Sequence, residues 1–92
     1  MSKQIVLSNK FQNSLKAIIR NSKYLPENFY ERILLKLQNL KVFPNMYPIS
    51  KKTKYRKISF QGYIILYYIK KHQIRIADIV LVKMKKANQY LY

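Results

Sequence analysis

The hydrophobic pattern of this chain changes its period at two prolines, Pro44 and Pro48, within the stretch FPNMYP. Before them, apolar residues recur at three- and four-residue intervals, the spacing of one face of an α-helix. After them, apolar and polar residues alternate, which is typical of β-strands. Proline disfavours the α conformation in the residue before it, so a helix that reaches this point must end at Phe43. The pattern predicts a helical first half and a β-rich second half.

The first half predicts a short strand followed by two helices. Residues 4–7 are β-prone, and Ser8 or Asn9 can cap the helix that follows, because a short oxygen-bearing side chain accepts bonds from free backbone amides. The apolar face of this first helix consists of Phe11, Leu15, Ile18 and Ile19. A second helix begins near Pro26. Its apolar face consists of Phe29, Ile33, Leu37 and Leu40.

The second half predicts three strands, over residues 54–61, 63–70 and 74–82. The only glycine, Gly62, marks a tight turn between the first two. The first of these strands alternates, with Arg56, Ile58 and Phe60 on one side and Tyr55, Lys57 and Ser59 on the other. The order β-α-α-β-β-β predicts a single α+β domain over residues 1–92, with a helical hairpin packed on one side of a small, mainly antiparallel four-stranded sheet.

Charge and composition narrow the function classes. Nineteen Lys and Arg residues face three Asp and Glu residues, so the formal net charge is +16. A surface this basic attracts polyanions such as nucleic acid or an acidic protein. The chain has no cysteine, which excludes a disulfide framework and a cysteine-type zinc site, and we expect neither a metal nor another cofactor. The longest apolar run, residues 63–69, is too short to cross a bilayer, so we expect a cytoplasmic protein without a membrane partner.

Two segments together resemble the RelE/ParE superfamily of toxins from type II toxin–antitoxin modules. They are the helix and its end, NFYERILLKLQNLKVFPNMYP, and the hairpin YRKISFQGYIILYYI. Family members commonly show a leucine-striped second helix closed by Phe-Pro and a second proline. A basic strand, a Gly-Tyr turn and an apolar-aromatic strand then follow. The resemblance covers nearly the whole chain.

The resemblance implies a toxin that is silenced by a cognate acidic antitoxin protein. RelE-like members cleave messenger RNA in the ribosomal decoding site, and ParE-like members poison DNA gyrase. The favoured hypothesis is a ribosome-dependent mRNA endonuclease, with the ribosome and mRNA as further partners. The alternatives are a gyrase poison without catalytic activity, and a nucleic-acid-binding or inactive relative.

The resemblance also implies catalytic positions. Attack of a ribose 2′-hydroxyl on its phosphate builds negative charge, which cations stabilise, and requires proton transfer. The positions that match those of the nuclease members are Arg56, Lys57, Lys86 and Tyr92. Nuclease members also place an arginine directly after the Gly-Tyr turn, where this chain has Ile64. That departure favours the gyrase-poison branch, whereas the charge of +16 favours RNA.

Other basic and aromatic residues are candidates for binding nucleic acid. They are Lys54, Lys83, Lys85 and Tyr90. Lysines clustered without a nearby acid can contact phosphates, although Lys54 can equally belong to a solvated strand end. Tyr63, Tyr67 and Tyr68 can stack on bases, but the preferred interpretation is that they pack within the sheet. Phe43, Met46 and Tyr47 are expected to pack into the core at the helix end.

Overall fold

The computed structural model describes residues 3–22, 25, 27–50 and 53–83. Its elements follow the predicted order β-α-α-β-β-β, so the α+β class is confirmed. The elements are β1 (Gln4–Leu7), α1 (Asn9–Asn21), α2 (Phe29–Asn39), β2 (Arg56–Phe60), β3 (Tyr63–Lys70) and β4 (Gln73–Leu81).

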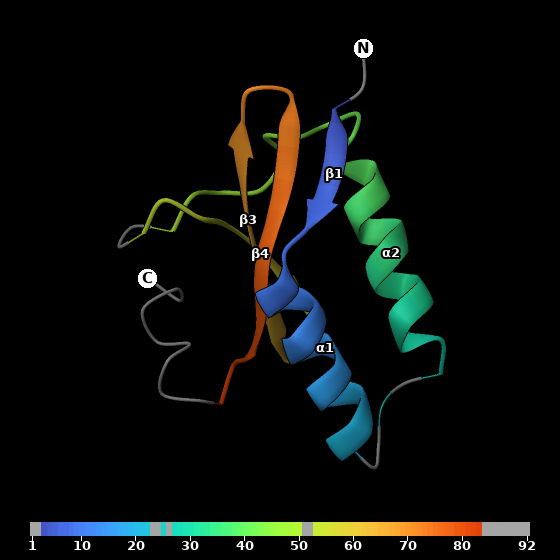
Figure 1. Ribbon diagram of the computed structural model, residues 1–92. Helices are drawn as coiled ribbons and strands as arrows, with labels where there is room; N and C mark the ends of the chain where they lie inside the picture. The colour runs from blue at the N-terminus through green and yellow to red at the C-terminus, as the bar shows by residue number, and fades with distance from the viewer. Residues whose placement is uncertain (1–2, 23–24, 26, 51–52, 84–92) are drawn as a thin grey trace.

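The four strands form one mixed sheet in the order β1-β4-β3-β2 (Figure 1). The three consecutive strands β2, β3 and β4 pair antiparallel, and β1 pairs parallel with β4. The parallel pair requires a long connection, which the chain provides by running through both helices before it enters β2. Residues near the two ends of the chain therefore meet in the sheet.

The predicted tight turn at Gly62 is confirmed. Phe60 pairs with Tyr63, and the two residues between them, Gln61 and Gly62, have φ angles of 49° and 86°. Two consecutive positive φ angles are typical of the type I′ turn, whose twist matches that of the adjoining strands. Glycine adopts this conformation without a steric penalty, so the position of the only glycine fixes where β2 ends.

The core lies between the sheet and the two helices, which cover one face. Helix α1 contributes Phe11 and Leu15, and helix α2 adds further buried apolar residues. The buried α2 and sheet residues of this cluster are Phe29, Ile33, Leu37, Leu40, Ile58, Phe60, Ile65, Tyr67, Ile74, Ile76 and Ile79. The apolar faces that the helical and strand periodicities predicted thus pack together in one core.

Helix α2 ends four residues before Phe43, at Asn39. Leu40 and Lys41 continue as tight turns, because their backbone amides bond to carbonyl oxygens three residues earlier. The side chains of Phe43 and Met46 are 62% and 52% exposed, so the prediction that they pack into the core was wrong. Tyr47 takes that place and packs edge-on against Tyr67, with ring centroids 6.4 Å apart.

Candidate functional site

The sheet has a second face, opposite the helices, which we call the outer face. Strand alternation places on it Lys57, Ser59, Ile64, Leu66, Tyr68, Arg75 and Val80. Its centre is apolar, because Ile64, Leu66 and Val80 form a second buried cluster. Tyr55, Ala77 and Val82 pack against this cluster. The middle of the outer face is therefore a closed apolar floor.

Ile64 occupies the position directly after Gly62-Tyr63, where nuclease relatives are expected to hold an arginine. It pairs with Ser59 on β2 and Val80 on β4, and its side chain is only 1% exposed. An aliphatic side chain enclosed in this way stabilises the sheet but cannot donate a proton or neutralise a phosphate. The structure thus gives Ile64 a packing role.

Arg56 and Lys57, two of the predicted catalytic residues, point to opposite faces of β2. Arg56 lies on the helix side, where its Nη1 donates hydrogen bonds to the carbonyl oxygens of Tyr47 at 2.7 Å and Asn45 at 3.4 Å. Lys57 pairs with Leu66 and lies on the outer face. Since the two cations face opposite ways, the sheet does not bring them together at one phosphate.

A cationic and aromatic group borders the apolar floor at one end. The Lys54 Nζ lies 4.8 Å from the ring centroid of Tyr68 and 5.7 Å from that of Tyr55. The two rings meet at a steep angle with their centroids 5.9 Å apart, and Arg75 pairs with Tyr68 across the strands. Tyr68 is half-buried rather than part of the core, whereas Tyr67 is fully buried. We call Lys54, Tyr55, Tyr68 and Arg75 the aromatic–cation group.

The sequence interpretation treated the tyrosines of β3 alike and did not foresee the aromatic–cation group. Strand alternation separates Tyr67 from Tyr68, so their different faces were already visible in the sequence. What the sequence did not show is that Tyr55 and Lys54, which directly precede β2, contact Tyr68 near the end of β3. This pairing depends on the hairpin register that the two-residue turn sets.

The remaining predicted residues lie at or beyond the end of β4. Lys83 is exposed just after the strand. Four others lie outside the described residues, so their roles stay predictions: Lys85, Lys86, Tyr90 and Tyr92. Within the described part of the chain, no group of three or more His, Asp or Glu side chains gathers as metal ligands would.

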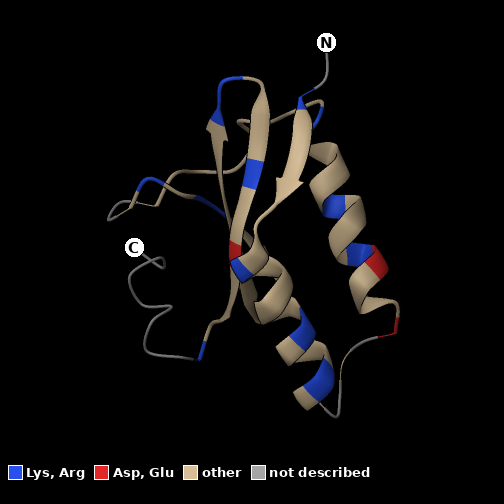
Figure 2. Ribbon diagram, in the orientation of Figure 1, with Lys and Arg blue, Asp and Glu red and all other residues tan. Residues whose placement is uncertain are grey.

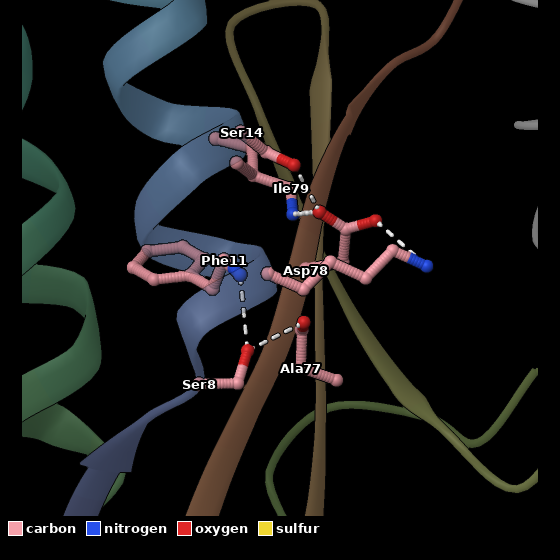
Figure 3. A network of polar contacts seen from close by, with 7 residues as sticks. Ser8, Phe11, Ser14, Ala77, Asp78 and Ile79 are labelled. Atoms are coloured by element: carbon pink, nitrogen blue, oxygen red, sulfur yellow. Dashed lines mark hydrogen bonds and ion pairs between the residues drawn. The ribbon is translucent and has the colours of Figure 1, made fainter.

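The buried acid Asp78 belongs to a polar network between β4 and the start of α1 (Figure 3). Its Oδ1 accepts hydrogen bonds from Ser14 Oγ at 2.7 Å and from the Ile79 amide at 2.8 Å. Its Oδ2 lies 3.7 Å from the Nζ of Lys10. The register of β4 against β3 shifts here, as in a β-bulge. Because these partners all belong to the fold, the network is structural.

Ser8 joins the same network as the cap of α1. Its Oγ accepts a hydrogen bond from the Phe11 amide at 3.0 Å and donates one to the Ala77 carbonyl oxygen at 2.8 Å. The sequence left Ser8 and Asn9 open as caps, and the structure selects Ser8. The cap and the Asp78 contacts together fix the first turn of α1 against β4.

Tyr67 links the core to the loop after α2. Its hydroxyl donates a hydrogen bond to the Pro44 carbonyl oxygen at 2.9 Å. Burial raises the pKa of this hydroxyl above its usual value, and the nearby charge of Arg56 opposes the rise. The group thus stays protonated at neutral pH and serves as a fixed donor.

Comparison with known proteins decides the family. Residues 5–85 match the family model of the ParE toxin of the type II toxin–antitoxin system parDE. The chain belongs to this toxin family. The fold agrees with that assignment: a free-state mutant of the E. coli toxin RelE superposes with a TM-score of 0.67 at 14% sequence identity, covering 98% of this chain and 94% of RelE.

A conserved hypothetical protein from Helicobacter pylori shares the fold as well. Its solution structure superposes with a TM-score of 0.58 at 13% identity, covering 86% of this chain and 93% of that one. A search of curated protein sequences found no match. Both structural likenesses are remote in sequence and so describe the fold alone.

Membership of the family makes this chain the toxin of a type II toxin–antitoxin system, and implies an antitoxin as its partner. The charge distribution suits an acidic partner, since basic residues spread over both helices and the hairpin between β3 and β4 (Figure 2). Neither described helix is long and apolar enough to cross a membrane.

Proposed function

We propose that this toxin inhibits growth by binding its target without catalysis, as the ParE-like members that poison DNA gyrase do. The observation that carries the proposal is the apolar floor of the outer face. Ile64, Leu66 and Val80 are each no more than 2% exposed, at the place where an RNA-cleaving relative needs a cation. The Ile64 side chain offers no charge to a phosphate that becomes more negative during cleavage.

The position of Arg56 supports the same proposal. Its guanidinium is engaged by two backbone carbonyl oxygens of the loop after α2, on the helix side of the sheet. These bonds hold the Nη1 end of its side chain against that loop. Of the two basic residues predicted on β2, Lys57 alone is oriented towards the outer face.

Ribosome-dependent cleavage of mRNA is the second candidate, and the aromatic–cation group favours it. Tyr55 and Tyr68 offer rings on which bases can stack, and Lys54 and Arg75 offer charges for phosphates. The predicted roles of Lys86 and Tyr92 belong to this candidate too. A toxin of either type is proposed to act in the cytoplasm, where gyrase and ribosomes are found.

Two assays with the purified toxin distinguish gyrase poisoning from mRNA cleavage. The first arm incubates the toxin with DNA gyrase, ATP and relaxed plasmid, and measures supercoiling and gyrase-linked DNA breaks. The second arm incubates it with translating ribosomes and maps the mRNA ends. A non-catalytic gyrase poison inhibits supercoiling and leaves the mRNA intact, and its effect survives the double change Lys54→Gln with Arg75→Gln.

New mRNA ends within ribosome-bound codons, with gyrase unaffected, would overturn the proposal in favour of cleavage. In that case the double change in the aromatic–cation group should abolish the new ends. A folded protein that acts in neither arm would contradict both candidates.

A further inference from the structure

The loop after α2 displays a patch of exposed apolar side chains. We call this the loop patch; it consists of Val42, Phe43, Met46 and Ile49. Their side chains are between 52% and 68% exposed, although the chain offers a core in which residues of these types are normally buried. Grouped exposure of this kind marks interaction surfaces, whereas single exposed apolar residues are ordinary.

The backbone beneath the loop patch is held in place by four contacts. The carbonyl oxygen of Pro44 accepts from Tyr67, and that of Tyr47 accepts from Arg56. The Pro48 carbonyl oxygen accepts from the Lys57 amide at 3.2 Å, and the Ser50 amide donates to the Tyr55 carbonyl oxygen at 2.8 Å. These last two bonds make up the antiparallel bridge between Ile49 and Arg56. A patch on a fixed backbone can bind with little loss of loop entropy.

Beside the loop patch lies a depression with both apolar and cationic walls. The residues that line it are Lys3, Asn45, Ile49, Lys54, Arg56, Tyr68 and Ile69. It thus joins the loop patch, through Ile49, to the aromatic–cation group, through Lys54 and Tyr68. Its lining contains three cations and no acid. An acidic segment with protruding apolar side chains complements these walls in charge and in polarity.

We propose that the loop patch and this depression bind an acidic segment of the antitoxin, with apolar anchors of that segment covering Phe43 and Met46. The proposal rests on family membership and does not depend on how the toxin acts. A second copy of this chain is a poor occupant, because two molecules of charge +16 repel each other. A lipid surface is flat and lacks side chains that could enter a depression with Ile49 and Ile69 in its walls.

The test measures binding of the cognate antitoxin by the toxin, with the antitoxin sought as a short acidic protein in the adjacent reading frame. The dissociation constant is determined by calorimetry for the wild type and for the double change Phe43→Ser with Met46→Ser. If the antitoxin covers both side chains, the double change should raise the dissociation constant at least about tenfold. Lys54→Gln should also weaken binding, and should reduce its dependence on salt.

Leu35→Ser provides a matched control, because Leu35 is 63% exposed on α2, much like Phe43 at 62%. Leu35→Ser is compared with the single change Phe43→Ser, which removes a similarly exposed apolar side chain, and circular dichroism melting confirms that each variant folds. The proposal is overturned if the double change binds the antitoxin as the wild type does, or if Leu35→Ser weakens binding as much as Phe43→Ser does.

Two further readouts distinguish other occupants. If the double change abolishes toxicity in cells without antitoxin but leaves the antitoxin affinity unchanged, the loop patch faces the target and the proposal fails. It also fails if vesicles of phosphatidylserine and phosphatidylcholine bind the wild type and not the double variant, while antitoxin binding is unaffected. Support requires weakened antitoxin binding by a folded variant, whether or not that variant remains toxic.

Discussion

The hydroxyl of Tyr67, in the centre of β3, is bonded at 2.9 Å to the carbonyl oxygen of Pro44 in the loop that follows α2. Proline ends the helical path, and the Tyr67 hydroxyl provides a donor for the carbonyl oxygen at that point. The FPNMYP stretch therefore does more than stop a helix, because it anchors a loop whose Phe43 and Met46 side chains remain exposed.

Tyr67→Phe tests this anchor. The change removes the hydroxyl and little else, and leaves the Pro44 carbonyl oxygen without its donor. We expect the free energy of unfolding to fall by about 1 kcal/mol at pH 7, as for a typical hydrogen bond in a protein. Urea denaturation measures the effect. Tyr30→Phe, at an exposed position on α2, is the control and should change stability by less than about 0.5 kcal/mol.

The stability difference between the wild type and Tyr67→Phe should also depend on pH. Burial raises the pKa of Tyr67 in the folded state, so its contribution is fully present below the unfolded value near 10 and is lost as pH rises through the higher folded value. The difference in unfolding free energy between the wild type and Tyr67→Phe should therefore narrow above about pH 10. A difference that stays constant up to pH 11 would show that the hydroxyl titrates normally.

Asp78 supports a second stability prediction. Asp78→Ala leaves the Ser14 hydroxyl and the Ile79 amide without their acceptor, so we expect a loss of about 2–3 kcal/mol. Asp78→Asn keeps an acceptor oxygen and should cost less. Lys10→Ala should change stability by less than about 0.5 kcal/mol, because the Lys10 side chain is 75% exposed and its ion pair spans 3.7 Å. Thermal melts of the three variants test this ranking, and an equal loss in Lys10→Ala would contradict it.

Most of the fold could be predicted because it follows from local chemistry. The alternation of residues 54–61 and the single glycine defined the β2–β3 hairpin, and helical spacing defined the buried face of α2. The loop after α2 could not be predicted in the same way. Residue type favours burial of Phe43. In the structure, however, Tyr47 enters the core instead, because its ring packs on Tyr67 and the Tyr67 hydroxyl holds the Pro44 carbonyl oxygen.

The candidate site was predictable only in part. The alternation already placed Arg56 with Ile58 and Phe60, on what proved to be the helix side, whereas its predicted catalytic role came from the family resemblance. Its partners are the carbonyl oxygens of Tyr47 and Asn45, nine and eleven residues earlier in the irregular loop after α2, and no periodic pattern in the sequence shows how that loop folds. The enclosed environment of Ile64 likewise depends on the pairing of three strands.

The two basic residues of β2 should respond differently to substitution. Arg56→Gln loses the contacts to Tyr47 and Asn45 and should lower the free energy of unfolding by about 1–2 kcal/mol. Lys57→Gln, on the outer face, should change it by less than about 0.5 kcal/mol. If the toxin acts without catalysis, both variants stay toxic when they are folded. Growth after induction, read together with urea denaturation, checks this; loss of toxicity in a stable Lys57→Gln protein would favour RNA cleavage.

Ile64→Arg is the sharpest test of the outer face. In a nuclease of this family the change restores a cation where relatives are expected to hold one, so activity should be preserved or increased. In this structure the new guanidinium would enter an apolar cluster with Leu66 and Val80, at a position that is 1% exposed. A charge buried among apolar side chains should cost about 4 kcal/mol or more, a large share of the stability of a small domain.

The expected result is thus an unfolded or poorly soluble Ile64→Arg protein without toxicity. Ile64→Val is its control, because it shortens the same side chain without adding charge and should cost only about 0.5–1.5 kcal/mol. We expect Ile64→Val to remain folded and toxic, as measured by circular dichroism melting and by growth after induction. If Ile64→Arg instead folds and cuts ribosome-bound mRNA faster than the wild type, its side chain reaches a phosphate. The apolar floor would then be an RNA-binding surface, and the proposal of a non-catalytic poison would be wrong.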